Sequence, residues 1–282
     1  MKKIILSLFI LIYFSGCSQP NTIKTPNNLR IHFLDVGQGD AILIQTPENK
    51  DIIIDGGPDN KILNELGQVM PFWDNTIDIM ILTHPHSDHI IGLIEILNRY
   101  NVKQIFYTGV PYPSIEYTKW LSLIAEKQIP TVIIKSYINL ELENQLTLEF
   151  LYPDSDISQK HFEEINNSSI VNLLTYNNNK FLFTGDAEFE VEDHLIETYQ
   201  FLQTNLLKIG HHGSHSSSSD AFLTIISPQF AIIQVGVNNT FNHPHLITLK
   251  RLERNNIPIF RTDLLGTITF FSNGQNIWTN NS

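Results

Sequence analysis

The chain has 282 residues, 42% of them hydrophobic, and its formal net charge at pH 7 is −11. This composition can supply a sizeable core and suits one large α/β domain that follows an N-terminal segment. The negative charge opposes tight, nonspecific binding to a polyanion such as DNA, and the lack of a glycine-rich P-loop motif leaves nothing that indicates an ATPase.

The first 17 residues have the pattern of an export signal. Two lysines precede an apolar stretch, Ile4 to Phe14, which is too short to span a bilayer comfortably. Residues 14–17 read FSGC and resemble the lipobox of bacterial lipoproteins, in which the cysteine is acylated and becomes the new N-terminus. Cys17 is the only cysteine, so no internal disulfide can form. We expect an exported lipoprotein, anchored at the extracytoplasmic face of the cell membrane through Cys17 with residues 18–28 as a linker; an uncleaved anchor or ordinary secretion are the alternatives.

Apolar runs downstream predict strands and helices that alternate in two halves of one domain, residues 29–282. In the first half we expect strands at Leu29–Leu34, Ala41–Thr46, Asp51–Asp55 and Ile77–Leu82, a helix at Lys61–Met70, and shorter units centred on Ile105, Leu121 and Val132. In the second half we expect strands near Leu146–Leu151, Ile170–Tyr176, Phe181–Thr184, Leu206–Ile209 and Ala231–Val235, and helices near Glu188–Phe201, Ala221–Ile226 and His245–Asn255. The pattern is typical of an α/β fold and leaves the strand order open.

A dense polar motif follows the run Ile77–Leu82, where residues 83–89 read THPHSDH. Three imidazoles and a carboxylate so close together match the ligands of borderline cations such as zinc. Apolar residues recur at helical spacing after the motif, so it passes from a strand end to a helix start. His84 and His86 would then face one ion, and Asp88 and His89 a second. The alternative is a solvated loop that is rich in histidine by accident.

The motif HPHSDH resembles the central signature of the metallo-β-lactamase superfamily, and other segments match in the expected order. Residues 52–57 (IIIDGG) resemble its first motif, and residues 181–186 (FLFTGD) resemble the strand that delivers a metal-bridging aspartate. Residues 31–40, 207–214 and 242–245 are similar to the hydrolase domain of bacterial DNA-internalisation competence proteins, and secreted phosphorylcholine esterases share much of the pattern. The resemblance implies a four-layer αββα sandwich that holds two divalent metal ions, zinc or manganese.

The resemblance also suggests roles for residues outside the central motif. Asp186 would bridge two ions, unless it is an ordinary turn residue after Thr-Gly. Asp55, which two glycines follow, would orient a ligand imidazole. Of the next pair, we expect His211 to bind metal and His212 to lie near the leaving oxygen, and the reverse division stays open. His243 would be a further ligand or a proton donor.

One ligand of the superfamily is missing. A histidine is expected on the loop before the strand that leads to Asp186, but residues 164–169 read EINNSS, as competence-type domains also tend to. The nearest histidine, His161, stands on a polar stretch and is more typical of a solvent-facing side chain. The site could therefore bind one cation weakly, prefer manganese to zinc, or recruit His243.

The loop at residues 213–220 is rich in serine and precedes a predicted helix. Hydroxyl groups and free backbone amides there would suit a phosphate, so Ser214 and Ser216 are candidate substrate contacts, unless the loop is flexible and ends in an ordinary helix cap. Basic residues are sparse. Their only cluster, Lys250, Arg251, Arg254 and Arg261, is either a solvated helix face or a rim for nucleic acid.

These patterns predict a metal-dependent hydrolase, namely a phosphodiesterase or nuclease of the competence type that uses a metal-bound hydroxide, with Asp88, His212 and His243 as catalytic groups. The expected partners are a phosphodiester substrate, with DNA as one candidate, and the membrane; no protein partner is predicted. The alternatives are hydrolysis of phosphorylcholine esters or another small ester or amide, including β-lactams, and a noncatalytic metal-binding lipoprotein.

Overall fold

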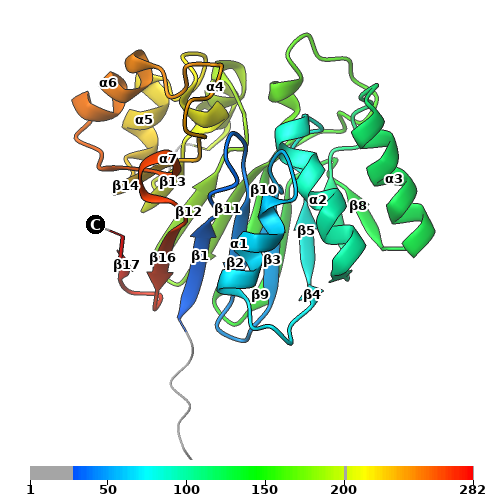
Figure 1. The fold of residues 1–282 in the computed structure, drawn as a ribbon. Coiled ribbons are helices and arrows are strands. Elements are labelled where there is room, and N and C mark those ends of the chain that lie inside the picture. Colours follow the sequence, from blue (N-terminus) through cyan, green and yellow to red (C-terminus); the bar gives the residue numbers. More distant parts are fainter. Residues whose placement is uncertain (1–27, 200–201, 282) are drawn as a thin grey trace, which may run out of the picture.

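The structure, a computed structural model, describes residues 28–199 and 202–281 (Figure 1). The predicted signal at residues 1–17, with Cys17, and the linker up to residue 27 lie outside this part of the chain. Among the residues that are described, no helix combines the length and the apolar content that crossing a membrane requires.

Eight strands form the first sheet, in the order β17-β16-β1-β2-β3-β5-β7-β8. Their bounds are β1 Leu29–Phe33, β2 Ile42–Gln45, β3 Asp51–Ile54, β5 Ile79–Ile81, β7 Ile105–Tyr107, β8 Thr131–Ile133, β16 Ile268–Ser272 and β17 Ile277–Thr279. Three helices pack on one face of this sheet: α1 Lys61–Val69, α2 Ser87–Arg99 and α3 Ile115–Lys127. Two short strands, β4 Thr76–Ile77 and β6 Asn101–Val102, pair separately.

Seven strands form the second sheet, in the order β15-β14-β13-β12-β11-β10-β9. Their bounds are β9 Ile138–Glu143, β10 Leu146–Tyr152, β11 Val171–Tyr176, β12 Asn179–Phe183, β13 Leu206–Lys208, β14 Phe230–Ile233 and β15 Ile259–Arg261. The helices of this half are α4 Phe189–Thr198, α5 Asp220–Ile226, α6 Leu246–Arg254 and α7 Thr262–Leu265, with 3-10 turns η1 Ile165–Ser168 and η2 Gly210–Gly213. Figure 1 shows α4, α5 and α6 on the opposite side of the molecule from α2 and α3.

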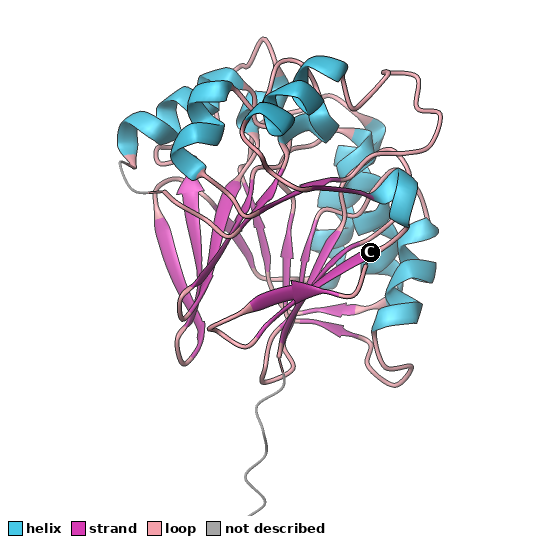
Figure 2. Cartoon of the chain, turned by 90° about the vertical axis from the view of Figure 1, so that its left-hand side faces the viewer, coloured by secondary structure: helices cyan, strands magenta, loops and turns pink. Residues whose placement is uncertain are grey.

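Three apolar clusters separate the layers, because both faces of each sheet are apolar. In β2, Ile42 and Ile44 lie in the cluster between the sheets, whereas Leu43 between them packs with α1 and α2. In β13, Leu206 lies between the sheets, and Leu207 lies in the third cluster with α4 and α5. The two sheets and their outer helices therefore form the expected αββα sandwich (Figure 2).

The sequence did not predict every element. The expected strand Ile77–Leu82 is divided into β4 and β5, and β9, β15, β16 and β17 were not expected. The C-terminal segment returns to the first sheet, where β16 pairs antiparallel with β1. This pairing joins residues more than two hundred positions apart, such as Ile31 and Phe270. Short strands of this kind are stabilised by distant partners rather than by local periodicity.

The topology brings several strand ends to one edge of the sandwich. In the first sheet β3, β5, β7 and β8 run parallel, and in the second β12, β13 and β14 do. Asp55 follows β3, His84 follows β5, Asp186 follows β12, and His211 and His212 follow β13. Since β1 is antiparallel to β2, and β2 to β3, residue Leu29 begins β1 at the opposite edge.

Candidate metal centre

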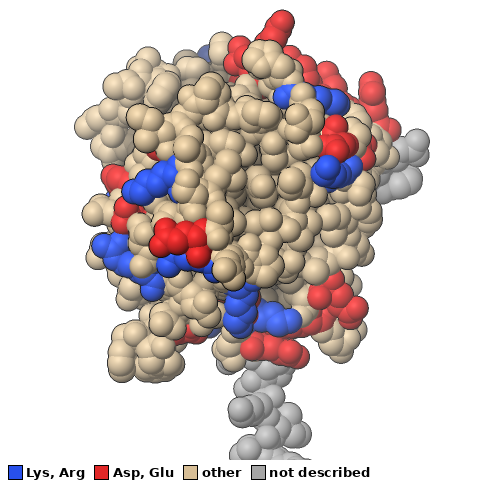
Figure 3. Space-filling model, turned by 90° about the vertical axis from the view of Figure 1, so that its right-hand side faces the viewer, with Lys and Arg blue, Asp and Glu red and all other residues tan. Residues whose placement is uncertain are grey.

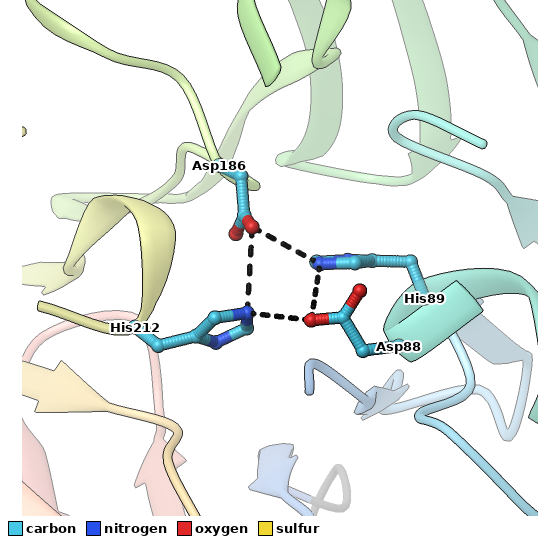
Figure 4. Close-up of side chains that lie close together, drawn as sticks. All are labelled: Asp88, His89, Asp186 and His212. Carbon is cyan, nitrogen blue, oxygen red and sulfur yellow. Dashed lines mark hydrogen bonds and ion pairs between the residues drawn. The ribbon is translucent and has the colours of Figure 1, made fainter. Parts of the chain in front are cut away.

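Four polar side chains from three parts of the chain converge at this edge. The ligand atoms of Asp88, His89, Asp186 and His212 all lie within 4.8 Å of one another. His212 Nε2 is 3.3 Å from both Asp88 Oδ2 and Asp186 Oδ2, and His89 Nε2 is also 3.3 Å from Asp186 Oδ2 (Figure 4). We call these residues the four-residue cluster.

The cluster fits a divalent metal ion. Its donors are two imidazoles and two carboxylates, which suit borderline cations such as zinc, manganese or iron. Three of the four residues are buried, yet His212 Nε2 and Asp186 Oδ1 have no hydrogen-bond partner. Buried polar atoms without a partner cost free energy, so their presence here points to a ligand that they share.

His84 and His86 lie beside the cluster and form a second group of donors. β5 ends at Ile81, His84 follows it, and His86 is the residue just before α2, so that Asp88 and His89 fall in the first helical turn. His84 Nε2 is 3.1 Å from His86 Nδ1 and 3.9 Å from Asp186 Oδ2. Asp186 belongs to the four-residue cluster and also approaches the second group, which is the position of a residue that was expected to bridge two ions.

Ser169 lies at the end of the loop on which a third-motif histidine was expected. Its Oγ accepts a hydrogen bond of 3.1 Å from the backbone N–H of Asp186 and lies 3.3 Å from His84 Nδ1. Ser169 is fully buried, whereas His161 is exposed and lies outside the cluster. The His84 and His86 group therefore gains no third imidazole from this loop.

Asp55 orients His89, as the sequence predicted. Its Oδ2 accepts hydrogen bonds from His89 Nδ1 at 2.8 Å and from Thr83 Oγ1 at 2.7 Å, and its Oδ1 accepts from the Thr83 backbone N–H at 2.8 Å. The bond to Nδ1 leaves His89 Nε2 facing Asp186. A carboxylate that fixes a ligand imidazole in this way is a common feature of metal sites.

The charges within the cluster oppose the effect of burial. Burial alone would lower the pKa of His89, but the carboxylates of Asp186, Asp55 and Asp88 raise it well above its usual value. Burial would raise the pKa of Asp186, but His212 and His89 hold it well below its usual value. The carboxylates thus remain charged and the two imidazoles retain protons that a metal ion would displace, so metal binding should release protons.

For the two histidines after β13, the geometry favours the reverse of our preferred prediction, in which His211 was the metal ligand. His212 is buried, and its Nδ1 donates a 3.0 Å hydrogen bond to the Gln234 carbonyl, which turns Nε2 toward the cluster. The His211 side chain is 24% exposed and its Nδ1 lies 3.0 Å from Glu188 Oε1. The geometry therefore favours His212 as the ligand and leaves His211 outside the cluster.

Sequence reasoning missed two charged residues behind the cluster, Asp40 and Lys208. The Lys208 side chain is fully buried; its Nζ contacts the Asp40 carboxylate, donates a 3.0 Å hydrogen bond to the Gly185 carbonyl and lies 3.8 Å from Asp186 Oδ1. Asp40 Oδ1 is 3.2 Å from His212 Nδ1. The sequence did contain a signal for this pair, namely a lysine at the end of the apolar strand β13. A buried lysine is rare unless it has a charged partner, so its position indicates a buried carboxylate nearby.

The serine-rich loop at residues 213–220 forms hydrogen bonds within the protein. Ser216 Oγ donates a 2.8 Å hydrogen bond to Glu188 Oε1, and Ser214 Oγ lies 3.0 Å from Ser216 Oγ. The backbone amides of Ser218 and Ser219, just before α5, donate to the Glu192 carboxylate. This carboxylate takes the position that was expected to hold a phosphate, so the loop is not a free anion cradle.

Three of the four residues of the predicted basic cluster also form ion pairs or hydrogen bonds within the protein. Arg254 pairs with Asp220 at 2.7 Å and Arg261 pairs with Asp263 at 2.5 Å, whereas Arg251 donates to the carbonyls of two loop residues, His215 and Ser217. Lys250 is exposed. On the face in Figure 3, Lys and Arg side chains are interspersed with Asp and Glu rather than gathered in a continuous basic surface.

His243 reaches the same edge from the loop before α6. Its ring centroid is 5.3 Å from that of His211 and 6.3 Å from that of His212. Its Nδ1 is buried without a hydrogen-bond partner, and burial lowers the pKa of His243 to about 4. A neutral imidazole with a free ring nitrogen therefore stands beside the four-residue cluster.

Comparison with known proteins identifies the family of this fold and site. The profile of the metallo-β-lactamase superfamily matches residues 34–237. The chain belongs to the metallo-β-lactamase superfamily. Among solved structures of that fold, the Bacillus subtilis protein YhfI aligns with a TM-score of 0.56 at 12% identity, covering 90% of this chain and all of that one.

Within this superfamily the chain is related to competence proteins. It is 30% identical over 260 residues to ComE operon protein 3 of Bacillus subtilis, covering 85% of this chain and 32% of the relative. It is 26% identical over 254 residues to competence protein ComA of Neisseria gonorrhoeae, covering 86% and 32% respectively. The chain thus spans about a third of the length of these relatives. The metallo-β-lactamase fold and the His/Asp cluster together describe a metal-dependent hydrolase.

Proposed function

We propose that this hydrolase is a phosphodiesterase that acts on nucleic acid. The observation that carries the proposal is the buried four-residue cluster with unpartnered His212 Nε2 and Asp186 Oδ1, next to the second donor group of His84 and His86. Two adjacent donor groups suit two divalent cations, zinc or manganese, which when bound make water acidic and offset the charge of a phosphate. The resemblance of its motifs to DNA-internalisation competence proteins favours DNA as a candidate, and the chain is similar to competence protein ComA.

The chain's own residues supply orientation, charge balance and hydrogen bonds in this proposal. Asp55 would keep His89 Nε2 directed at the cluster, and Lys208 would offset part of the negative charge that Asp40 and Asp186 create. His243 would donate a hydrogen bond from its neutral ring to the leaving oxygen, because its imidazole lies at the edge of the cluster with Nδ1 free. Ser169 in place of a histidine would leave one ligand position near His84 for a substrate oxygen.

Export and lipid attachment through Cys17 remain part of the proposal. The support is the apolar stretch and the FSGC sequence at residues 14–17, together with the position of Leu29. Since Leu29 begins β1 at the edge opposite the cluster, a membrane tether attached there would leave the proposed active site facing away from the lipid.

A substrate panel tests the proposed activity. The purified chain, supplied with zinc or manganese, should hydrolyse bis-p-nitrophenyl phosphate and DNA more readily than phosphorylcholine esters or a chromogenic cephalosporin. Asp186→Ala should lower the diesterase rate at least about 100-fold, because it removes a carboxylate shared by both donor groups. Asp154→Ala is the matched control, since this aspartate pairs with His194 on the surface.

The panel also separates the alternatives. Cephalosporin turnover without cleavage of any diester would overturn the choice of substrate class. Equal rates for Asp186→Ala and the unsubstituted chain would overturn hydrolysis at this cluster. Metal binding without turnover of any compound would favour a noncatalytic role.

A further inference from the structure

An aromatic pocket lies beside the proposed metal centre and is not part of it. It is an open pocket with a volume of about 590 Å³, and it is bordered by the loop after β7, the start of α3, β8, and the segment of Ser158 and Gln159. Its walls include the rings of Tyr107, Tyr112, Tyr117, Pro111 and Pro113. We call it the tyrosine pocket. A volume of this size is within the usual range for sites that bind small molecules.

One wall of the tyrosine pocket adjoins the metal centre. The Tyr112 ring meets the His86 ring edge to face, with centroids 5.6 Å apart. The neighbouring strands β5, β7 and β8 are parallel, so the loops after β5 and β7 emerge at the same edge of the first sheet. Tyr112 is half-buried and both prolines are exposed, so part of each ring remains accessible to a ligand.

The lining favours a planar, uncharged ring. The half-buried phenol rings of Tyr107 and Tyr112 offer flat faces, two prolines add apolar surface, and the side chains of Ser158 and Gln159 add hydrogen-bonding groups. Lys135 stands at the same pocket, paired at 2.9 Å with the exposed Asp156. The two charges offset each other, so the described residues that line the pocket include no free carboxylate of the kind that would hold a quaternary ammonium group such as choline, which aromatic pockets can also bind.

We propose that the tyrosine pocket binds a nucleobase of the substrate, next to the phosphodiester at the metal centre. The inference rests on the proposed phosphodiesterase activity, because the nucleobase is the part of the substrate that would make the enzyme prefer nucleotides. Bases of any sequence stack on aromatic side chains, so the pocket would select nucleotides over simple diesters without reading a sequence.

Binding without turnover tests the pocket first. The affinities of thymidine monophosphate and deoxyribose phosphate, which lacks the base, are measured by titration calorimetry with manganese present. Thr118→Trp fills the pocket from the exposed surface of α3, and Tyr112→Ala removes a stacking face. Each should lower the preference for the nucleotide by about tenfold, in line with the effect of removing one stacking ring. Tyr137→Ala, an exposed tyrosine outside the pocket, should keep the preference.

Turnover gives a second readout. Two esters with the same leaving group are compared, thymidine p-nitrophenyl phosphate and methyl p-nitrophenyl phosphate, and their kcat/KM ratio is the quantity of interest. Thr118→Trp should lower this ratio about tenfold, and Tyr137→Ala should not change it. Melting curves show whether each variant folds; where Tyr112→Ala does not, the surface variant Thr118→Trp decides.

The outcomes for the pocket and for the activity are distinct. If Thr118→Trp hydrolyses both esters with an unchanged kcat/KM ratio, the nucleobase assignment of the pocket is wrong and the phosphodiesterase proposal is unaffected. Base-dependent binding that Thr118→Trp weakens, with no hydrolysis of either ester, would support the pocket and overturn the activity. Equal affinity for thymidine monophosphate and deoxyribose phosphate, or binding of phosphorylcholine in preference to both, would overturn the nucleobase assignment.

Discussion

At the scale of single residues, His211 and His212 have the same side chain and opposite surroundings. Both have positive φ, 46° and 52°, so the backbone turns sharply between β13 and α5 and sends the two rings in different directions. His212 meets Asp88 and Asp186, whereas His211 meets Glu188 and Asn166. The contacts of each ring, rather than the order of the residues, decide which one can bind an ion.

The two histidines give a matched test of the metal centre. His212→Ala should weaken metal binding about 100-fold or more, because it removes a nitrogen that faces two carboxylates. His211→Ala should weaken it less than about tenfold, since this ring lies outside the cluster. Bound metal is counted by mass spectrometry after dialysis, and affinity is measured by competition with a chelator. Equal losses in the two variants would contradict the proposed ligand set.

At the scale of elements, the position of α2 depends on two glycines in contact. A Cβ on Gly92 would lie 1.8 Å from the Gly56 carbonyl oxygen, and a Cβ on Gly56 would lie 2.3 Å from the Leu93 nitrogen. The Gly56 N–H also donates a 2.8 Å hydrogen bond to the His89 carbonyl. The turn after β3 is therefore packed directly on the helix that carries Asp88 and His89.

Gly92→Ala should separate these two elements. We expect a loss of stability of about 1–3 kcal/mol or more, because backbone must move on both sides of the contact. The shift should also weaken metal binding at least about tenfold, since Asp88 and His89 lie one turn away. Urea unfolding and metal titration measure the two effects.

Gly67→Ala is the control for this substitution. Gly67 lies in α1, and a Cβ there would meet nothing within 4 Å. Alanine should therefore stabilise the protein by about 0.5–1 kcal/mol and leave metal binding unchanged. Normal stability and metal affinity in Gly92→Ala would show that the glycine contact does not position α2.

At the scale of the whole molecule, a buried polar network joins the two ends of the described chain. His32 in β1 lies 2.9 Å from Thr269 Oγ1 in β16 and 3.2 Å from Gln45 Oε1 in β2, and Gln45 Nε2 donates to Asp51 Oδ1 at 2.8 Å. The network crosses β16, β1, β2 and β3, far from the metal centre in the fold. It supports the return of the C-terminal strand to the first sheet.

His32 predicts how the whole fold responds to acid. Burial lowers its pKa from 6.5 to about 4, so the folded protein holds fewer protons on this group than the unfolded chain does. The resulting stability is complete above pH 6.5 and is lost as the pH falls from 6.5 to about 4, by up to about 3 kcal/mol. In urea unfolding between pH 7 and 4, His32→Gln should show a smaller loss than the unsubstituted chain.

Asp51 has the opposite dependence and must be separated from His32. Burial raises its pKa from 3.8 to about 6, so the stability it contributes is present below pH 3.8 and is lost as the pH rises toward 6. The comparison of His32→Gln with the unsubstituted chain cancels this contribution, because Asp51 is present in both. Parallel pH profiles for the two proteins would contradict the assignment to His32.

Local features of the sequence predicted most of the strands and helices and most of the candidate site, whereas the layered fold was predicted by the resemblance to the metallo-β-lactamase superfamily. Buried strands that end in THPHSDH, IIIDGG and FLFTGD were visible because a strand, its end and the polar residue after it are consecutive in the chain. His84, Asp88 and His89 could be placed near one another on that basis, and the resemblance added Asp55; the structure brings them to the same edge with Asp186.

Only the tertiary structure decided which side chains meet. It placed His212 rather than His211 in the cluster, brought Lys208 to Asp40, and filled the amides before α5 with Glu192. It also paired β16 with β1 and put the Tyr112 ring against His86. Each of these contacts joins separate segments, or depends on the direction of a ring, and periodicity along the chain carries no information about either. The reason is physical: a strand or a turn arises from neighbouring residues, whereas the partner of a buried charge is set by the packing of both sheets.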